Sequence, residues 1–160
     1  MDEKRSAQKI RVASPDDAEG VATLITLAYR VEDFFIDGDR TDPADVRQLM
    51  QDGVFLLLEG DSSLAGAVYV KLRRGRGYFG MLSVDPARQG QGLGRRLVFA
   101  AEEWCRTAGC TEVEIEVVSL RTELPPFYER LGYAVSGTRP FPDMHKSRMP
   151  CEFLVMRKSL

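Results

Sequence analysis

The chain has 160 residues, a mass of 17.9 kDa and a formal net charge of −2 at pH 7, with 44% hydrophobic and 29% charged residues. This length and composition are typical of one globular domain, and we expect a single domain over residues 1–160. The three cysteines lack paired or metal-ligand spacing, and no apolar run approaches the ~18 residues of a membrane span. We therefore predict a cytoplasmic protein without a metal site, a disulfide framework or a membrane partner.

Hydrophobic patterning predicts an α/β chain. Ser14-Pro15 and Asp42-Pro43 are helix starts, since each pairs a capping side chain with a proline in the first turn. The predicted strands cover residues 9–13, 54–59, 64–72, 78–84, 112–118, 133–135 and 152–157, and the predicted helices cover about 14–29, 42–52, 93–109 and 123–131. This order favours a mixed sheet with helices on both faces.

A glycine-rich turn joins the strand at 78–84 to the long helix that follows. The stretch PARQGQGLGRRL places Gly90, Gly92 and Gly94 where free backbone N–H groups of a helix N-terminus would bind a phosphate. Arg95 follows Gly94, which excludes a P-loop ending and a dinucleotide fingerprint. The literal GxGxxG at 75–80 leads into a strand, so we take it as a chance match.

Basic charge surrounds this turn. Residues 71–96 hold seven basic residues and one acid, a charge of +6 that leaves −8 for the rest of the chain. A solvated turn or a nucleic-acid surface would also be basic, but the chain has neither a basic domain nor a groove-reading motif. A ligand with several phosphates explains the charge and the glycines together, and we predict no nucleic-acid partner.

Two motifs resemble the GNAT superfamily of N-acetyltransferases, which transfer the acetyl group of acetyl-CoA to an amine. Residues 89–94, QGQGLG, are similar to the pyrophosphate loop of that family, and residues 125–133, PPFYERLGY, are similar to its FYExxGF segment. The resemblance implies a mainly antiparallel sheet of six to seven strands, with a cleft where the fourth and fifth strands splay. It also implies acetyl-CoA as the donor substrate.

Carried over by position, the resemblance implies a donor site. Backbone groups of Leu82 and Val84 would pair with the pantetheine arm, and backbone amides would hold the pyrophosphate along Gln89, Gly90, Gln91, Gly92, Leu93, Gly94 and Arg95. Tyr128 falls on the frequent general acid of the family and would protonate the departing thiolate, since a phenol with a pKa near 10 keeps its proton at neutral pH.

The base and the acceptor site are less well marked. The fourth strand, YFGMLSV, lacks the glutamate that the family often uses, so Glu116 on the next strand is the candidate base, with a solvated strand face and a water base as alternatives. Glu32, Asp33, Phe35 and Ser119 lie where the family shapes its acceptor pocket. Together with Asp37 and Asp39, the acids among them favour a cationic acceptor.

The leading hypothesis is transfer of acetyl from acetyl-CoA to a primary amine of a small molecule or peptide, by direct attack in a ternary complex. The missing fourth-strand acid motivates one alternative, a non-catalytic acyl-CoA-binding regulatory module. The sequence is compatible with a monomer or a homodimer.

Overall fold

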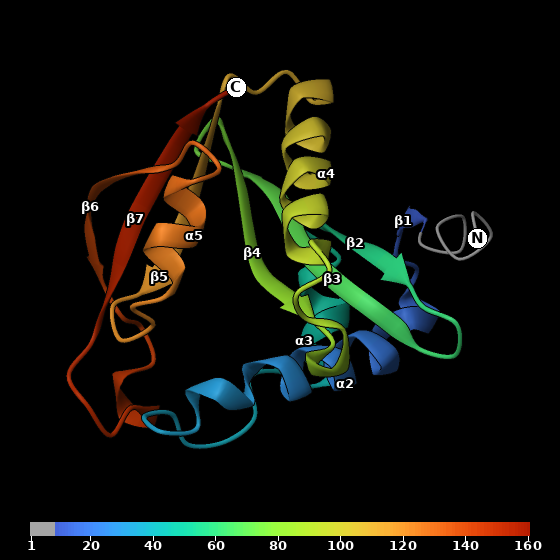
Figure 1. Ribbon diagram of the computed structural model, residues 1–160, viewed down its shortest axis with the longest axis horizontal. Coiled ribbons are helices and arrows are strands. Elements are labelled where there is room, and N and C mark those ends of the chain that lie inside the picture. Colours follow the sequence, from blue (N-terminus) through green and yellow to red (C-terminus); the bar gives the residue numbers. More distant parts are fainter. Residues whose placement is uncertain (1–8) are drawn as a thin grey trace.

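The computed structural model describes residues 9–160, in which helices and strands alternate largely as predicted (Figure 1). The strands are β1 Ile10–Val12, β2 Val54–Glu59, β3 Leu64–Arg73, β4 Arg76–Val84, β5 Glu112–Val118, β6 Ala134–Pro140 and β7 Glu152–Ser159. The helices are α2 Ala18–Ala28, α3 Pro43–Leu49, α4 Leu93–Thr107 and α5 Leu124–Glu129, with short 3-10 turns η1 Pro15–Asp17, η2 Tyr29–Glu32, η3 Pro86–Arg88 and η4 Met144–Lys146.

The strands form one seven-stranded sheet in the order β1-β2-β3-β4-β5-β7-β6. All neighbouring pairs are antiparallel except β4 and β5, which are parallel because α4 carries the chain back over the sheet between them. The predicted mixed, mainly antiparallel sheet is confirmed. None of the helices in residues 9–160 is both long enough and apolar enough to cross a membrane.

Helices cover both faces of the sheet, as predicted. The alternation along β2 divides its side chains: Leu56 and Leu58 belong to the core beneath α4, while Phe55 and Leu57 belong to the core that α2 and α3 complete. Figure 1 shows α4 and α5 in front of the sheet and α2 and α3 behind its lower part. β2 is therefore buried on both faces and contributes to the core under each helical layer.

β4 and β5 pair over only two positions, Gly77 with Val113 and Tyr78 with Glu114. Beyond Tyr78 both strands continue, but they diverge, as Figure 1 shows for the lower half of the sheet. This divergence is the predicted splay, and it opens the sheet at the carboxyl ends of two parallel strands, a usual place for a ligand site.

The predicted elements differ from the structure mainly at their ends. The strand expected at 133–135 is β6, which runs from Ala134 to Pro140. The prediction was too short because β6 is an edge strand with mostly exposed residues, and its sequence shows no alternation. The helix expected over 42–52 ends at Leu49. The helix expected from Ser14 begins as the turn η1 and becomes α-helical at Ala18.

Candidate active site

Two cavities lie in the splayed part of the sheet and meet. One, of about 510 Å³, is bordered by the glycine-rich turn and α5, and we call it the donor cavity. The other, of about 290 Å³, lies between β4, β5 and the segment after α2, and we call it the acceptor cavity. Four residues line both: Tyr29, Leu82, Leu124 and Tyr128. Ligands in the two cavities would therefore meet at these side chains.

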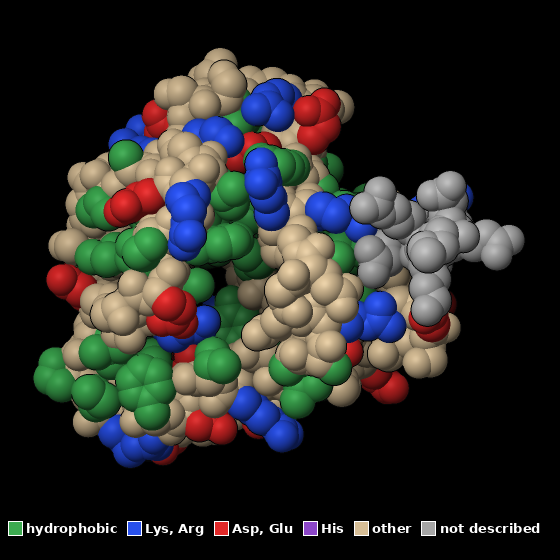
Figure 2. Space-filling model, viewed as in Figure 1, with side chains coloured by type: hydrophobic (Ala, Val, Ile, Leu, Met, Phe, Trp, Pro, Cys, Tyr) green, Lys and Arg blue, Asp and Glu red, His purple; other side chains and the backbone are tan. Residues whose placement is uncertain are grey.

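The donor cavity is open to solvent on one face of the molecule. Figure 2 shows this face hollowed between the α4 side and the α5 side, with hydrophobic side chains in the recess and Lys or Arg side chains beside it. An apolar recess with a basic border suits a ligand that has both a hydrocarbon arm and phosphates.

A β-bulge in β4 turns Leu82 toward the junction. Between the pairs Ala67–Ser83 and Tyr69–Gly80, two residues of β4 oppose only one residue of β3. Met81, inside the bulge, has φ +52°, a left-handed conformation that is costly for a side chain of this size. The Ser83 hydroxyl donates to the carbonyl oxygen of Met81 at 3.0 Å and helps to hold the bulge. The bulge lets Met81 and Leu82 both line cavities.

The glycine-rich turn brings backbone N–H groups to the donor cavity. Gly90 and Gly92 have φ +82° and +75°, and Gly92 is the N-cap of α4. A side chain at either position would be strained, so the turn depends on both glycines. Gly92, Leu93, Gly94 and Arg95 all line the cavity, as do Gln89 and Gly90, whereas the exposed Gln91 does not.

The electrostatics of this turn favour an anion. The first turn of α4 contains no acid, although acids are the side chains that stabilise a helix N-terminus. Arg88 and Arg95 line the cavity instead. The orphan N–H groups of the first turn of α4 and two basic residues in the cavity lining therefore favour a pyrophosphate at this turn.

Tyr128 lies at the junction of the two cavities. Its ring is 7% exposed and packs against Phe79, Phe127 and Tyr133. Burial raises the pKa of its hydroxyl well above the usual value of 10. Across residues 9–160 no group hydrogen-bonds this hydroxyl, so it is a protonated donor available to a ligand.

Glu116 lines the acceptor cavity, but its carboxylate is already engaged. One of its oxygens, Oε1, accepts hydrogen bonds from Arg73 at 2.6 Å and from Arg139 at 3.0 Å. Taking up a substrate proton would weaken both ion pairs. This geometry is better suited to holding the cavity wall than to accepting a proton.

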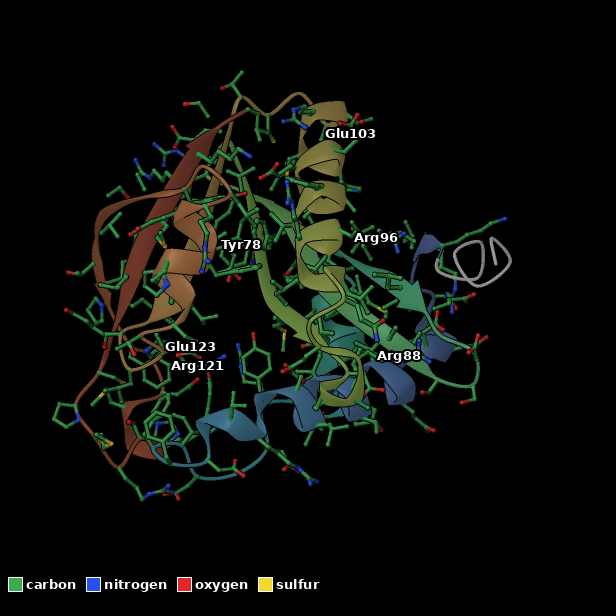
Figure 3. The ribbon with its side chains drawn as sticks, in the orientation of Figure 1. Tyr78, Arg88, Arg96, Glu103, Arg121 and Glu123 are labelled. Carbon is green, nitrogen blue, oxygen red and sulfur yellow. The ribbon has the colours of Figure 1, made fainter. Side chains whose placement is uncertain are left out.

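Glu32 also lines the acceptor cavity and is paired. Its carboxylate accepts a hydrogen bond of 2.9 Å from Arg121, which lines the donor cavity. Figure 3 shows Arg121 beside Glu123, below α5 and on the side toward η2. Burial raises the pKa of Glu32, while the Arg121 guanidinium opposes that shift.

The other predicted acceptor-site residues line neither the donor nor the acceptor cavity. Phe35 is fully buried. Asp33 is exposed, and its carbonyl oxygen accepts a hydrogen bond from Arg148. The Ser119 hydroxyl accepts a hydrogen bond of 3.0 Å from the backbone of Glu152 at the end of the β5–β7 pair. Of these predicted residues, only Glu32 reaches the acceptor cavity.

The sequence profile of the Acetyltransferase (GNAT) family matches residues 23–133, more than two thirds of the chain. The chain belongs to the GNAT family of N-acetyltransferases. This match contains the splayed strands, the glycine-rich turn and Tyr128, and so covers the junction of the two cavities.

Relatives of this GNAT protein are named as acetyltransferases of different small molecules. An aminoglycoside N(6')-acetyltransferase type 1 of Stenotrophomonas maltophilia is 32% identical over 121 residues, covering 68% of this chain and 74% of that protein. A probable glucosamine 6-phosphate N-acetyltransferase 2 of Oryza sativa subsp. japonica is 28% identical over 145 residues, covering 84% and 86%. A mycothiol acetyltransferase of Saccharopolyspora erythraea is 34% identical over 83 residues, but the chain spans only 27% of its length.

Solved GNAT structures share the fold. The PaiA N-acetyltransferase of Thermoplasma acidophilum, solved in complex with coenzyme A, superposes with a TM-score of 0.73 and 20% identity, covering 95% of this chain and 98% of that one. At this identity the comparison supports the fold alone.

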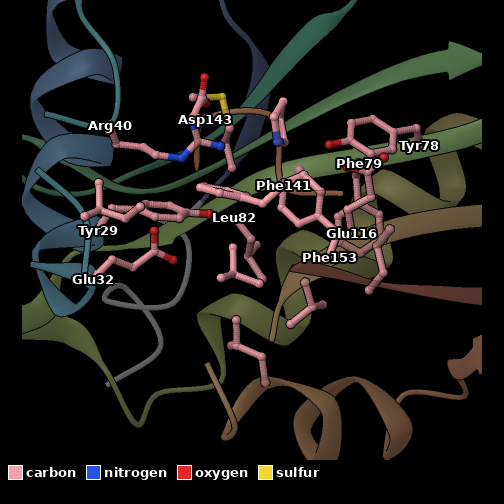
Figure 4. A pocket seen from close by; sticks show the side chains of 18 of the residues that line it. Tyr29, Glu32, Arg40, Tyr78, Phe79, Leu82, Glu116, Phe141, Asp143 and Phe153 are labelled. Atoms are coloured by element: carbon pink, nitrogen blue, oxygen red, sulfur yellow. The ribbon is translucent and has the colours of Figure 1, made fainter. Parts of the chain in front are cut away.

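The structure adds Tyr78 of this GNAT chain, which the sequence analysis did not select. Tyr29 and Tyr78 both line the acceptor cavity, and Figure 4 shows Tyr29 reaching toward Leu82 from the side of Glu32. Burial raises the pKa of Tyr78 to about 12. A Cβ at Gly80 would lie 2.7 Å from the Tyr78 hydroxyl, so glycine at 80 lets this ring fold over its own strand. In the sequence GRGYFG, the glycine two residues after Tyr78 was the one feature that could have indicated the position of this ring.

Proposed function

We propose that this protein transfers the acetyl group of acetyl-CoA to a primary amine of a small molecule. The observation that carries the proposal is the meeting of two cavities at Tyr128 and Leu82, one of them bordered by a basic, glycine-rich helix N-terminus. The size of the acceptor cavity, about 290 Å³, suits a small acceptor or the end of a larger one.

The donor would bind with its pyrophosphate on the backbone N–H groups of residues 90–95 and its pantetheine arm along β4. Past Tyr78, β4 has no β5 partner, so backbone groups at Leu82 and Val84 face the opening. An extended arm with amide groups can pair with such an edge as an added strand does. The thioester would then reach the junction at Tyr128.

The reaction follows from the chemistry of a thioester and an amine. The neutral amine attacks the carbonyl carbon, a C–N bond forms, and the oxyanion of the tetrahedral intermediate needs a donor, for which we propose a backbone N–H of the bulge near Leu82. The C–S bond then breaks, and Tyr128 gives its proton to the thiolate. We propose that water takes the ammonium proton, because Glu116 and Glu32 are both held in ion pairs.

Direct attack in a ternary complex is supported by the position of the cysteines. A covalent route would need a nucleophile beside the thioester. Cys105, Cys110 and Cys151, all within the described part of the chain, line neither cavity. Burial also raises the pKa of Cys105 to about 12, which keeps it a thiol.

The experiment is a thiol assay of CoA release from acetyl-CoA with a panel of primary amines, followed by mass spectrometry of the acetylated product. We expect amine-dependent release and intersecting initial-rate patterns when both substrates are varied. If acetyl-CoA binds but no amine accelerates the release of CoA, the protein is a binding module and the proposal fails.

A further inference from the structure

The acceptor cavity continues, at the end away from Tyr128, into a groove of about 710 Å³. Six residues line both, of which four are charged: Asp39, Arg40, Asp143 and Lys146. The groove does not include Leu82, Leu124 or Tyr128. An acceptor whose amine lies at the junction would therefore place its other end among these four charges.

These four side chains differ from the other charges of the acceptor cavity. Glu32 is paired with Arg121, and Glu116 is paired with Arg73 and Arg139. In the part of the chain that the structure describes, by contrast, no salt bridge involves Asp39, Arg40, Asp143 or Lys146. The charges of the cavity that no salt bridge holds, two acidic and two basic, thus lie at one end.

Four basic and four acidic residues line the groove, and three of the basic ones lie over aromatic rings. The Arg40 guanidinium lies over the Tyr29 ring, 5.3 Å from its centroid, and Figure 4 shows the side chain extending into the pocket. Lys146 lies on η4, and Lys71 lines the groove beyond, its ammonium 5.9 Å from the Tyr78 ring centroid. The rings orient these cations without neutralising them.

Most of the acids that favoured a cationic acceptor are held in ion pairs or lie outside the cavities. Glu32 is neutralised by Arg121, and Asp37 forms an ion pair with Arg148. Asp33 lines none of the three cavities. The groove also contains Asp42 and Asp45, whose carboxylates already accept hydrogen bonds from the Asp45 backbone and the Thr41 hydroxyl. A purely cationic acceptor would meet Arg40 and Lys146, with Asp39 and Asp143 as the acids of the acceptor cavity beside them.

We infer that the acceptor carries, besides its amine, an anionic oxyacid group, a carboxylate or a phosphate, which Arg40 and Lys146 bind. The inference rests on the proposed function and specifies its acceptor class. A guanidinium fork matches both oxyacid groups, and a lysine beside it adds a second charge-assisted donor. Asp39 and Asp143 lie beside the cations and disfavour acceptors that carry two anionic groups.

The test compares matched amines that differ only in the anionic group: tyramine with tyrosine, ethanolamine with phosphoethanolamine, and glucosamine with glucosamine 6-phosphate. We expect the anionic member of at least one pair to have the higher kcat/KM, and the carboxylate and phosphate pairs identify which group is bound. Arg40→Gln and Lys146→Gln should each lower the kcat/KM of the anionic member by about tenfold or more relative to that of the neutral member, through KM.

Arg30→Gln is the control variant, because it removes the same charge from an exposed position on η2 that lines none of the three cavities. It should leave the preference unchanged. The inference is overturned if the neutral member is preferred in every pair, or if Arg40→Gln and Arg30→Gln behave alike.

A failure of the proposed function is distinguishable from a failure of this inference. If no amine is acetylated, the proposed function fails, and calorimetric titration of the same pairs into CoA-saturated protein still measures the preference. Tighter binding of an anionic member that Arg40→Gln weakens supports the inference. Equal binding of both members overturns it.

Discussion

Glu32 and Arg121, 89 positions apart in the chain, are joined by a hydrogen-bonded ion pair of 2.9 Å. Glu32 belongs to η2 and lines the acceptor cavity, whereas Arg121 follows β5 and lines the donor cavity. The pair therefore connects the two sides of the splayed sheet at the place where the cavities adjoin. Both side chains are mostly buried, with 9% and 15% of their surface exposed.

Arg121→Gln should lower the free energy of unfolding by about 3 kcal/mol, because it leaves the buried Glu32 carboxylate without its cation. Urea unfolding measures this change. Adding Glu32→Gln to the variant should restore part of the loss, since the unpaired charge is then removed as well. Equal stability of Arg121→Gln and the parent would show that the pair does not join the two sides.

Gly92→Glu should weaken acetyl-CoA binding by at least about 100-fold, because it places a carboxylate where we expect the pyrophosphate to bind. Isothermal titration calorimetry measures the Kd. Gly75→Glu is the matched control: Gly75 has φ +78°, close to the +75° of Gly92, it also has open space around it, and it lines none of the three cavities. Equal affinities of the two variants would contradict the assignment of the donor cavity.

Tyr128→Phe should lower kcat by about 100-fold and leave the Kd for acetyl-CoA and the thermal midpoint nearly unchanged, because the lost hydroxyl has no partner within residues 9–160. Tyr133→Phe is the contrasting variant. The Tyr133 hydroxyl donates to the buried Glu102 at 2.8 Å, so its loss should cost about 1 kcal/mol of stability and little turnover. Unchanged kcat in Tyr128→Phe would remove Tyr128 from the acid role.

As the pH increases, kcat should rise and should not fall again below about pH 10. The rise reports the amine losing its proton. An alkaline fall would require Tyr128 to lose its proton, and burial raises its pKa above the ordinary value of 10, so the acid form persists. A descending limb below pH 10 that Tyr128→Phe abolishes would show that the hydroxyl is not shielded as described.

The sequence predicted the parts of the fold that depend on local pattern. β2 and β5 match their predicted bounds, since alternation or a continuous apolar run marks buried strands, and α4 begins at Leu93 as the glycine-rich turn indicated. β6 was predicted too short, because an exposed edge strand has no pattern to reveal it. The position of β7 between β5 and β6 depends on long-range pairing, which local patterns do not encode.

The donor site was easier to predict than the acceptor site for a physical reason. A turn that binds a ligand through backbone N–H groups needs glycines at fixed spacing, and Gly90 and Gly92 can be recognised in the sequence by that spacing. The acceptor cavity is made by side chains from distant segments, so Tyr29, Tyr78 and Arg40 are brought together only by the splay of β4 and β5. In the bulge of β4 the left-handed residue is Met81 and not the adjacent Gly80, so the glycine did not indicate its position.

The measurement that tests the central claim most directly is a crystal structure of the protein with coenzyme A and an acceptor amine. We predict pyrophosphate oxygens within hydrogen-bond distance of backbone N–H groups in residues 90–95, and the sulfur beside the Tyr128 hydroxyl, with the amine entering from the acceptor cavity. Coenzyme A bound away from the glycine-rich turn, or a sulfur separated from Tyr128, would contradict the claim.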